Sequence, residues 1–283
     1  RMAAEDEYTS TMGIAAARIA LERADVDAAD LDLIIVATIT PDMPFPATAC
    51  IVQQELGATK AAAFDLEAAC TGFLYALEIG RQFIDSRMYQ NVLIIGAEKL
   101  SSIIDWKDRN TCVLFGDGAG AAVLQHRADS RGVLATRLGS DGGKANILAM
   151  PGGGCRQPAT INSVNERIHF LKMEGKEVFK NAVNAMTGAA KEVLERSGVG
   201  MEDIKCVIPH QANQRIISAV GERLGARNDQ VLVNLHKYGN TSAASVAVAL
   251  DEAVSTGRIE RGDLILIIAF GAGLTWGATV LEW

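Results

Sequence analysis

The sequence lacks the patterns that define a metal site, a membrane span or a nucleic-acid-binding surface. It has no CxxC pair and no cluster of cysteine and histidine at metal-ligand spacing, which argues against a zinc site. No apolar run is long enough to cross a bilayer, because glycine or a charged residue interrupts each one. Positive charge is in deficit, with a formal net charge of -7 over 283 residues, so a general affinity for nucleic acid is not expected.

No secretory signal is visible at the N-terminus, and the five cysteines are an odd number with wide spacing. Cys112 and Cys206 lie in strand-like apolar runs and Cys50 in a helical one, so these three are expected to be small buried hydrophobic residues in a reducing compartment. We therefore expect a cytoplasmic protein that binds no metal. The composition, 49% hydrophobic and 22% charged, is that of a globular protein with a large core.

Cys70 is distinguished by the pattern around it. An apolar stretch over Ala61–Leu66 predicts a buried strand, and a helical pattern starts at Phe73. The thiol is thereby placed between a strand and the first turn of a helix, where unpaired N–H groups and the helix dipole favour a thiolate. Its neighbours are alanine and glycine, so the sulfur stays approachable. A thiol so placed can attack a thioester or a carbonyl group.

Two polar residues far downstream are candidate partners of this thiol. His210 ends a strand-like run that starts at Val207, and Asn240 lies at a glycine-containing turn before a helix of small residues. Taken alone, each of the three residues has an ordinary interpretation, as a packed cysteine, a structural histidine and a turn asparagine. At three separate loop positions they also form a candidate catalytic set, and with their flanking motifs they favour catalysis.

The chain contains an internal repeat. Ala16–Val36 is similar to Ala189–Pro209 without a gap, and Asn91–Ala97 is similar to Asp263–Ala269. Each copy predicts a helix, a short acidic turn and a buried strand. Near-continuous apolar strands belong in a sheet that is covered on both faces, so the repeat indicates two units of alternating strands and helices.

These copies predict two halves related by a pseudo-twofold axis, residues 1–127 and residues 128–283. The boundary should fall near Gln125–Arg131, where the apolar pattern lapses. In the second half a strand-like run, Gly132–Thr136, comes well before the helix over Val178–Ser197, whereas the first half begins almost at its helix. We therefore expect that a leading strand and its connection are missing from the first half as given.

A glycine-rich segment, Gly116–Gly120, superficially resembles a dinucleotide-binding loop. It falls between two strand-like runs, Thr111–Phe115 and Ala121–Leu124, and no helical pattern opens after it. The sequence therefore predicts a tight turn there instead of a nucleotide site.

Four motifs, in this order, resemble those of the thiolase-fold condensing enzymes, and most closely the β-ketoacyl-acyl carrier protein synthase III family. They are Ala68–Phe73, Phe115–Ala121, Pro209–Asn213 and Gly239–Ser245. The resemblance covers nearly the whole chain. It implies an α/β, thiolase-like fold in which two βα halves with stacked mixed sheets form αβαβα layers. Family members carry further N-terminal residues, among them a tryptophan and an arginine that contact the coenzyme A adenine and have no counterpart here.

The function that the resemblance implies is the initiating condensation of type II fatty acid biosynthesis. Cys70 would accept an acyl group from acyl-coenzyme A, and malonyl-acyl carrier protein would lose carbon dioxide to give the attacking carbanion. His210 and Asn240 would stabilise the enolate, and the backbone N–H groups of Cys70 and Ala272 would stabilise the oxyanion. A thiolase would have a second cysteine near Gly271–Gly273, and none is there. By this resemblance a coenzyme A thioester would be a substrate, and no cofactor is expected.

Further residues are assigned by the resemblance alone. Those for coenzyme A and its pantetheine arm are Arg109, Met173, Gly175, Phe179, Ala212, Asn213 and Ile216. A basic patch for the acidic acyl carrier protein would comprise Lys180, Arg215 and Arg223, which a solvated helix face explains equally well. Phe45 would cap the acyl pocket of the partner subunit in a homodimer, or else anchor its own loop.

Three other functions stay open at this point. A polyketide or other starter synthase of the same fold would share the three residues and differ in pocket shape. A cysteine hydrolase would use Asn240 to orient His210 and would release the acyl group to water. A non-catalytic binding module would have lost activity with the missing N-terminal segment. The choice of primer depends on pocket volume, which the sequence does not fix.

Overall fold

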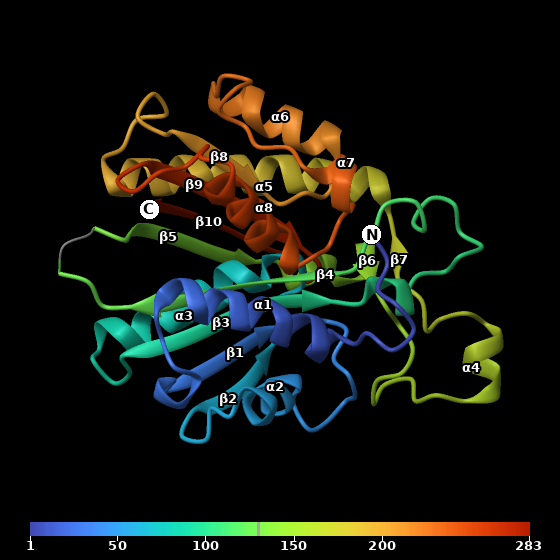
Figure 1. The fold of residues 1–283 in the computed structure, drawn as a ribbon. Coiled ribbons are helices and arrows are strands. Elements are labelled where there is room, and N and C mark those ends of the chain that lie inside the picture. Colours follow the sequence, from blue (N-terminus) through green and yellow to red (C-terminus); the bar gives the residue numbers. More distant parts are fainter. Residues whose placement is uncertain (129–130) are drawn as a thin grey trace.

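The structure is a computed structural model that describes residues 1–128 and 131–283. The expected boundary between halves near Gln125–Arg131 therefore lies partly outside the described residues, and the division at 127 and 128 stays a prediction. Two four-stranded sheets and a two-stranded one organise the described chain. In Figure 1 the blue to teal part of the chain lies below the orange to red part.

The first large sheet has the strand order β2-β1-β3-β4. Its first three strands are parallel to one another, and β4 is antiparallel to β3. The elements of this part are α1 (Thr9–Ala24), β1 (Leu33–Ala37), α2 (Thr48–Leu56), β2 (Ala62–Leu66), α3 (Gly72–Asp85), β3 (Asn91–Glu98) and β4 (Gly118–Gln125).

The second large sheet has the order β5-β10-β9-β8, in which β8 and β9 are parallel and β10 is antiparallel to both of its neighbours. The elements of this part are β5 (Val133–Ser140), α5 (Gly175–Ser197), β8 (Cys206–Pro209), α6 (Gln214–Leu224), α7 (Leu235–Tyr238), α8 (Ala244–Ser255), β9 (Leu264–Gly271) and β10 (Thr275–Glu282). Between β5 and α5 lie three short elements, β6 (Leu148–Ala149), α4 (Ile161–Asn165) and β7 (Lys172–Met173).

Strands that share a sequence pattern hold the same place in the two large sheets. The parallel neighbours β1 and β3 correspond to β8 and β9, and β4 and β10 follow them in antiparallel orientation. The expected fold of two related βα units is thereby confirmed. In the second sheet β5 lies beside β10, whereas no strand of the described residues occupies the corresponding place beside β4.

Three hydrophobic cores fill the space between five layers of helices and sheets. Ile34 and Val36 of β1 pack with α1 and α2 on the outer face of the first sheet, and Leu33 and Ile35 face the central layer formed by α3 and α8. The second sheet covers that layer from the other side, and its own outer face packs against α5 and α6. This αβαβα arrangement, visible in Figure 1, explains why these strands are apolar throughout, since both faces of each sheet are buried.

The prediction of a tight turn at Gly116–Gly120 is wrong. Thr111–Leu114 forms turns instead of a strand, Phe115 forms an isolated β-bridge with Asn240, and β4 begins at Gly118. A Cβ atom on Gly120 would lie 2.6 Å from the Cβ of Ala247 in α8, so the missing side chain lets β4 pack closely against that helix. At Gly120, therefore, the glycine serves the packing of a strand against a helix and not a turn. In the described part of the chain, no helix is long and apolar enough to span a membrane.

Candidate active site

Cys70 lies at the junction of the two halves. It belongs to a 3₁₀ turn, Ala69–Thr71, between β2 and α3. Ala69 has a φ angle of 46°, a left-handed conformation that is uncommon for alanine and that tends to occur at functional sites. From the other half, Gly271 comes so close that a Cβ atom on it would lie 2.7 Å from the amide nitrogen of Cys70. The loop of the thiol is thus held by both halves.

Burial dominates the acid–base behaviour of Cys70. Its side chain is 7% exposed, and burial raises the pKa of the thiol to about 12. The neighbouring Ser242 hydroxyl lowers that pKa in part, and the charge of Glu98 raises it further. The expectation of a thiolate favoured by the helix N-terminus is therefore wrong for the resting site, because loss of solvation outweighs it. The sulfur carries its proton until another group takes it.

His210 follows β8 and is fixed by two contacts. Its backbone N–H donates to the carbonyl of Ile268 at 2.7 Å, and its Nδ1 lies 2.5 Å from the hydroxyl oxygen of Ser245. Burial lowers the pKa of the imidazole to about 3, so the ring is neutral at physiological pH. Cys70 and His210 are therefore an uncharged pair in the resting site.

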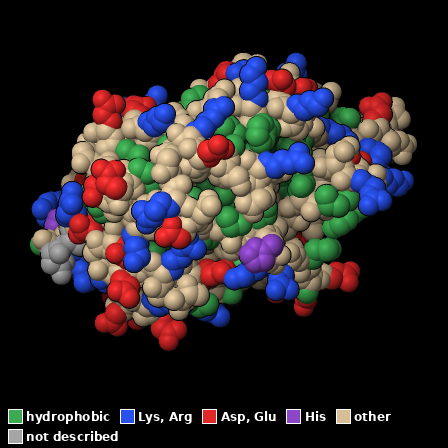
Figure 2. All heavy atoms as spheres, turned by 90° about the horizontal axis from the view of Figure 1, so that it is seen from above, with side chains coloured by type: hydrophobic (Ala, Val, Ile, Leu, Met, Phe, Trp, Pro, Cys, Tyr) green, Lys and Arg blue, Asp and Glu red, His purple; other side chains and the backbone are tan. Residues whose placement is uncertain are grey.

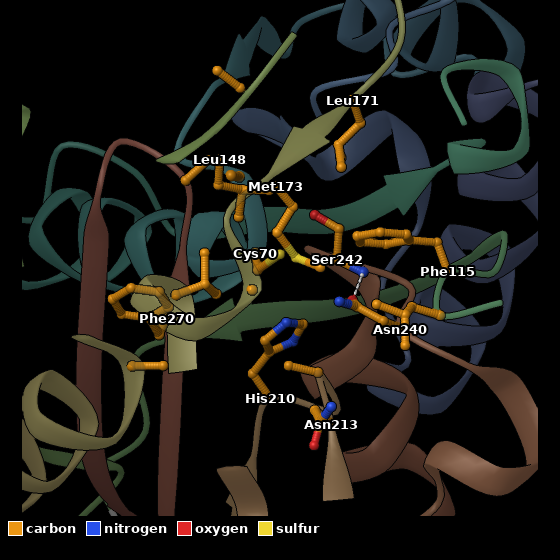
Figure 3. A pocket seen from close by; sticks show the side chains of 18 of the residues that line it. Cys70, Phe115, Leu148, Leu171, Met173, His210, Asn213, Asn240, Ser242 and Phe270 are labelled. Atoms are coloured by element: carbon orange, nitrogen blue, oxygen red, sulfur yellow. Dashed lines mark hydrogen bonds between the residues drawn. The ribbon is translucent and has the colours of Figure 1, made fainter. Parts of the chain in front are cut away.

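Asn240 is held by its backbone and by its amide oxygen. Its N–H donates to the carbonyl of Leu114, and its own carbonyl accepts from the N–H of Gly116, both at 2.9 Å. Its Oδ1 accepts the backbone N–H of Ser242 at 2.9 Å, the dashed line of Figure 3. Because the oxygen is engaged, the Nδ2 group remains to donate into the cavity.

Cys70, His210 and Asn240 line one cavity of about 1220 Å³, and Figure 3 shows their side chains directed toward a common space. All three are buried, whereas Lys176 and Phe179 at the other end are exposed, so the cavity reaches the surface. The residues expected along the pantetheine arm that line it are Met173, Gly175, Phe179, Ala212, Asn213 and Ile216.

Ala272, the second expected oxyanion donor, also lines this cavity. It is not among the described residues with a positive φ angle, so alanine is accommodated there without backbone strain. Thr275 connects its loop to that of the thiol. The Thr275 hydroxyl lies 3.0 Å from the carbonyl oxygens of Ala68 and Ala272 and 2.7 Å from the hydroxyl of Thr71.

Four of the expected residues do not line the cavity, namely Phe45, Arg109, Lys180 and Arg223. Arg109 is exposed between two polar residues that do line it, so it lies next to the mouth. Lys180 on α5 and Arg223 on α6 are exposed. Figure 2 shows one face of the molecule, on which basic side chains are spread among acidic ones. Arg215, the third member of the basic patch, does line the cavity.

Sequence reasoning missed the residues that hold the three central side chains in place. Ser242 and Ser245 belong to the Gly239–Ser245 motif, where only the asparagine received a role. Gln211 follows the histidine, is 1% exposed, and makes four hydrogen bonds that fix the loop after β8. Its partners are the backbone groups of Pro209, Leu232, Asn234 and Leu235. The available signal was a polar residue inside an otherwise apolar motif.

A thiol, a neutral imidazole and a carboxamide where two thiolase-like halves meet define a thiolase-fold condensing enzyme. Two family descriptions match the chain, 3-Oxoacyl-[acyl-carrier-protein (ACP)] synthase III over residues 64–142 and its C-terminal part over residues 194–283. The chain belongs to this 3-oxoacyl-[acyl-carrier-protein] synthase III family. It is accordingly an acyltransferase and an initiating condensing enzyme of fatty acid synthesis.

Individual relatives agree with this assignment. The chain is 57% identical to the beta-ketoacyl-[acyl-carrier-protein] synthase III of Caldanaerobacter subterraneus subsp. tengcongensis, over 100% of this chain and 86% of that protein. The solved 3-oxoacyl-[acyl-carrier-protein] synthase III of Aquifex aeolicus matches with a TM-score of 0.93 and 48% identity, over 100% of this chain and 87% of that one. A priming beta-ketosynthase from a polyketide biosynthetic pathway matches with a TM-score of 0.92 and 40% identity, over 100% and 84%.

Proposed function

We propose that this chain transfers an acyl group from an acyl-coenzyme A to Cys70 and condenses it with malonyl-acyl carrier protein to give a 3-ketoacyl-acyl carrier protein. The observation that carries the proposal is the convergence of Cys70, His210 and Asn240 on one cavity that reaches the surface. A long thin substrate arm can reach the buried thiol through such a cavity, while the polar head of the substrate stays outside.

In the acylation step the Cys70 sulfur attacks the thioester carbonyl carbon, and the tetrahedral oxyanion lies between the backbone N–H groups of Cys70 and Ala272. Thr275 supports this geometry because it bonds both loops that carry the donors. Collapse of the intermediate breaks the carbon–sulfur bond to coenzyme A and leaves the acyl group on Cys70. Oxyanion donors of this kind each contribute about 3 kcal/mol to lowering the barrier.

In the condensation step the malonyl group loses carbon dioxide, and negative charge develops on its thioester oxygen. The Nδ2 group of Asn240 and the Nε2–H of His210 are the donors to that oxygen. The neutral state of His210 suits this role. With a pKa of about 3 the ring carries no charge, and its single N–H group can donate a hydrogen bond to the oxygen. The carbanion then attacks the acyl carbonyl carbon, and the Cys70 sulfur departs with the bonding electron pair.

The contacts of His210 argue against a cysteine hydrolase. Such an enzyme needs Asn240 to orient the ring and an imidazole basic enough to hold the thiol proton. Instead Nδ1 of His210 faces Ser245, and the amide oxygen of Asn240 bonds the backbone of Ser242. The low pKa of the imidazole makes it a poor proton acceptor for a thiol whose own pKa is raised.

Charge at the cavity mouth supports a carrier protein as partner. Lys180, Arg215 and Arg223 lie on the neighbouring helices α5 and α6, and Arg215 also lines the cavity. An acidic carrier protein docked there would direct its pantetheine arm inward, past Phe179 and toward Cys70. Arg109 would contact the adenine part of coenzyme A from the opposite side of the mouth.

We further propose a cytoplasmic homodimer. In the described residues β2 is an edge strand that pairs only with β1, and its residues Phe64 and Leu66 are partly exposed. An uncovered edge strand of this kind is prone to pair with another chain. Phe45 is 83% exposed, which suits the expected contact with the acyl pocket of a partner subunit. Light scattering of the purified protein would test the dimer.

Intact-mass measurement separates the candidate functions. The protein is incubated with labelled acetyl-coenzyme A, with and without malonyl-acyl carrier protein. We expect an acyl adduct on Cys70 that disappears with formation of 3-ketoacyl carrier when malonyl carrier is added. Cys70→Ala should abolish the adduct, whereas Cys206→Ala, which removes another buried thiol, should leave it intact.

Two results would contradict the proposal. Release of free acid without a carrier product would support a hydrolase, and absence of any adduct would support a binding module. The polyketide starter alternative, which the similarity to a priming beta-ketosynthase keeps in view, gives the same adduct. It is recognised by a preference for longer or branched primers in a competition among acyl-coenzyme A substrates.

A further inference from the structure

Glu98 is a buried carboxyl group with an uneven set of partners. It ends β3 and is 0% exposed. Its Oε2 accepts three hydrogen bonds, from the hydroxyls of Thr38 at 3.2 Å and Thr40 at 2.7 Å and from the N–H of Ile39 at 3.1 Å. Its Oε1 has no partner, and none of the ion pairs found in the described residues involves Glu98. A buried carboxyl group without a cation needs a physical explanation.

Ser242 has a second buried oxygen without a hydrogen-bond partner. Its hydroxyl oxygen is buried and also has no hydrogen-bond partner, and the residue has a φ angle of 47°, so a left-handed backbone aims it. Gly96, two residues before Glu98 on the same face of β3, comes so close to the loop of Ser242 that a Cβ atom on it would lie 2.4 Å from the carbonyl oxygen of Ala243. In agreement with this packing, burial raises the pKa of both Glu98 and Cys70, and the Ser242 hydroxyl lowers both. Ser242 lines the cavity, and Figure 3 shows it close to Cys70 and Asn240.

Hydrogen counting shows what the three groups can do together. With a thiol present, Cys70 donates to the Ser242 oxygen and Ser242 donates to an ionised Glu98. With a thiolate present, Oε1 of Glu98 carries the proton and donates to Ser242, which donates to the sulfur. Both arrangements satisfy the orphaned oxygens, and they differ only in the transfer of one proton along the chain.

We propose that Glu98, acting through the Ser242 hydroxyl, accepts the proton of Cys70 during acylation and returns it to the departing thiol. Neither His210 nor solvent is needed for this transfer. The geometry that carries the inference is the pair of unpartnered buried oxygens, one on a carboxyl group and one on a hydroxyl that lines the cavity next to the nucleophile. Glu98 does not itself line the cavity, so its effect on substrate passes through Ser242.

The step conserves atoms and charge. The S–H bond of Cys70 breaks, its proton moves to Ser242, and the Ser242 proton moves to Glu98, while the sulfur electron pair forms the bond to the acyl carbon. When the tetrahedral intermediate collapses, the departing sulfur keeps the electron pair of the broken carbon–sulfur bond. It takes the proton back from Glu98 through the same hydroxyl. The relay rests on the proposed role of Cys70 as acyl acceptor.

Two reactions of Cys70 test the relay, because loss of Glu98 should affect them differently. Alkylation by iodoacetamide needs only a thiolate, whereas acylation by acetyl-coenzyme A needs the proton to move during the step. Alkylation is measured on the peptide that contains Cys70, because Cys50 and Cys155 are exposed. Both rates are followed from about pH 5.5 to 9 in the wild type, Glu98→Gln and Ser242→Ala, with Thr187→Val as the control that removes another buried, unpartnered hydroxyl.

In the wild type, alkylation should rise up to about pH 7 and then level off, because above that pH Cys70 and Glu98 share one proton. In Glu98→Gln the alkylation rate should keep rising about tenfold per pH unit. The acylation rate of this variant at pH 7.5 should be about a hundredfold below that of the wild type. Ser242→Ala should slow both reactions, and Thr187→Val should match the wild type. Thermal unfolding of each variant checks that it folds, and Glu98→Gln still decides the question if Ser242→Ala does not.

Acylation of Glu98→Gln at the wild-type rate, or a wild-type alkylation profile without a level region, would overturn the relay and leave the proposed function standing. A wild-type protein that forms no acyl-Cys70 at all would overturn both, and the absent adduct distinguishes that outcome from failure of the relay alone.

Discussion

The hydroxyl oxygen of Ser245 lies 2.5 Å from Nδ1 of His210, so Nδ1 is engaged within the protein and Nε2 is the ring nitrogen left for a substrate. A neutral imidazole carries one N–H group and one acceptor nitrogen. When Ser245 donates to Nδ1, the ring proton stays on Nε2, the nitrogen that must donate to the enolate oxygen in the condensation step. In this arrangement a residue in the first turn of α8 holds the ring proton on Nε2 of the residue that follows β8.

Replacing Ser245 by alanine should slow condensation and spare acylation. Without the hydroxyl the two tautomers become similar in energy and ring orientation loosens, so we expect about a tenfold loss, the effect of one hydrogen bond. Single-turnover measurement of each half-reaction separates the two steps. Ser255→Ala on the same helix is the control. Equal losses in both half-reactions would show that Ser245 has a general structural role.

His210→Ala and Asn240→Ala should form acyl-Cys70 and fail to discharge it. Each removes one donor to the enolate oxygen, so condensation should fall about a hundredfold to a thousandfold. The amount of acyl-enzyme after mixing with malonyl-acyl carrier protein is the measurement. Normal condensation by either variant would remove that residue from the enolate role proposed here.

Thr275 offers a test of the oxyanion site. Its hydroxyl connects the backbone of Ala68, in the loop of the thiol, to the backbone of Ala272. Thr275→Val keeps the shape and removes these bonds, so acylation should slow about tenfold while binding of acyl-coenzyme A is unchanged. Thr279→Val on the same strand, which removes a buried hydroxyl bonded to Thr136, is the matched control. A change confined to KM would point to substrate binding instead.

Acid should destabilise the protein in part through His210. Burial lowers the pKa of this ring to about 3 from an ordinary value of 6.5. Between those pH values the unfolded chain binds a proton that the native site excludes, so the free energy of unfolding falls as the pH falls. His210→Asn cannot take up this proton. From pH 7 to about pH 4.5 it should therefore lose on the order of 2 kcal/mol less than the wild type.

Denaturant unfolding at several pH values measures this difference. The exposed His236 supplies the control variant, His236→Asn, which should follow the wild type. Parallel curves for the wild type and His210→Asn would mean that the buried ring is protonated in the native state. The opposite slope applies to Glu98. Its pKa is raised from 4.5 to about 7, so between those pH values its contribution to the free energy of unfolding decreases as the pH rises.

Much of the fold was predictable because its strands are buried on both faces. The continuous apolar runs at β1, β3, β8 and β9, each after a recurring helix, predicted two similar sheets, and the layering is confirmed. The turn residues around Cys70, His210 and Asn240 likewise predicted loop positions for all three. Local pattern was sufficient there because strand ends and glycine turns are encoded by neighbouring residues.

What the sequence did not reveal depends on contacts between distant segments. Ser242 and Glu98 come from different segments of the chain. No local sequence pattern therefore predicts that this buried carboxyl group lacks a cation. The thiol pKa was misjudged because the position at a helix N-terminus is visible in the sequence, whereas the extent of burial is not. Gly120 was mistaken for part of a turn because the helix that packs on it lies far along the chain.

Charge reversal at the cavity mouth should weaken binding of the acyl carrier protein and leave binding of acyl-coenzyme A unchanged. Lys180 and Arg223 lie on exposed helix surfaces and do not line the cavity. Lys180→Glu and Arg223→Glu should each raise KM for malonyl-acyl carrier protein roughly tenfold at low salt. Added salt should shrink the difference, because screening acts on exposed charges. Lys191→Glu, exposed farther along α5, is the control and should have little effect. An equal rise in KM for acyl-coenzyme A, or a difference that salt does not reduce, would exclude an electrostatic docking patch at these residues.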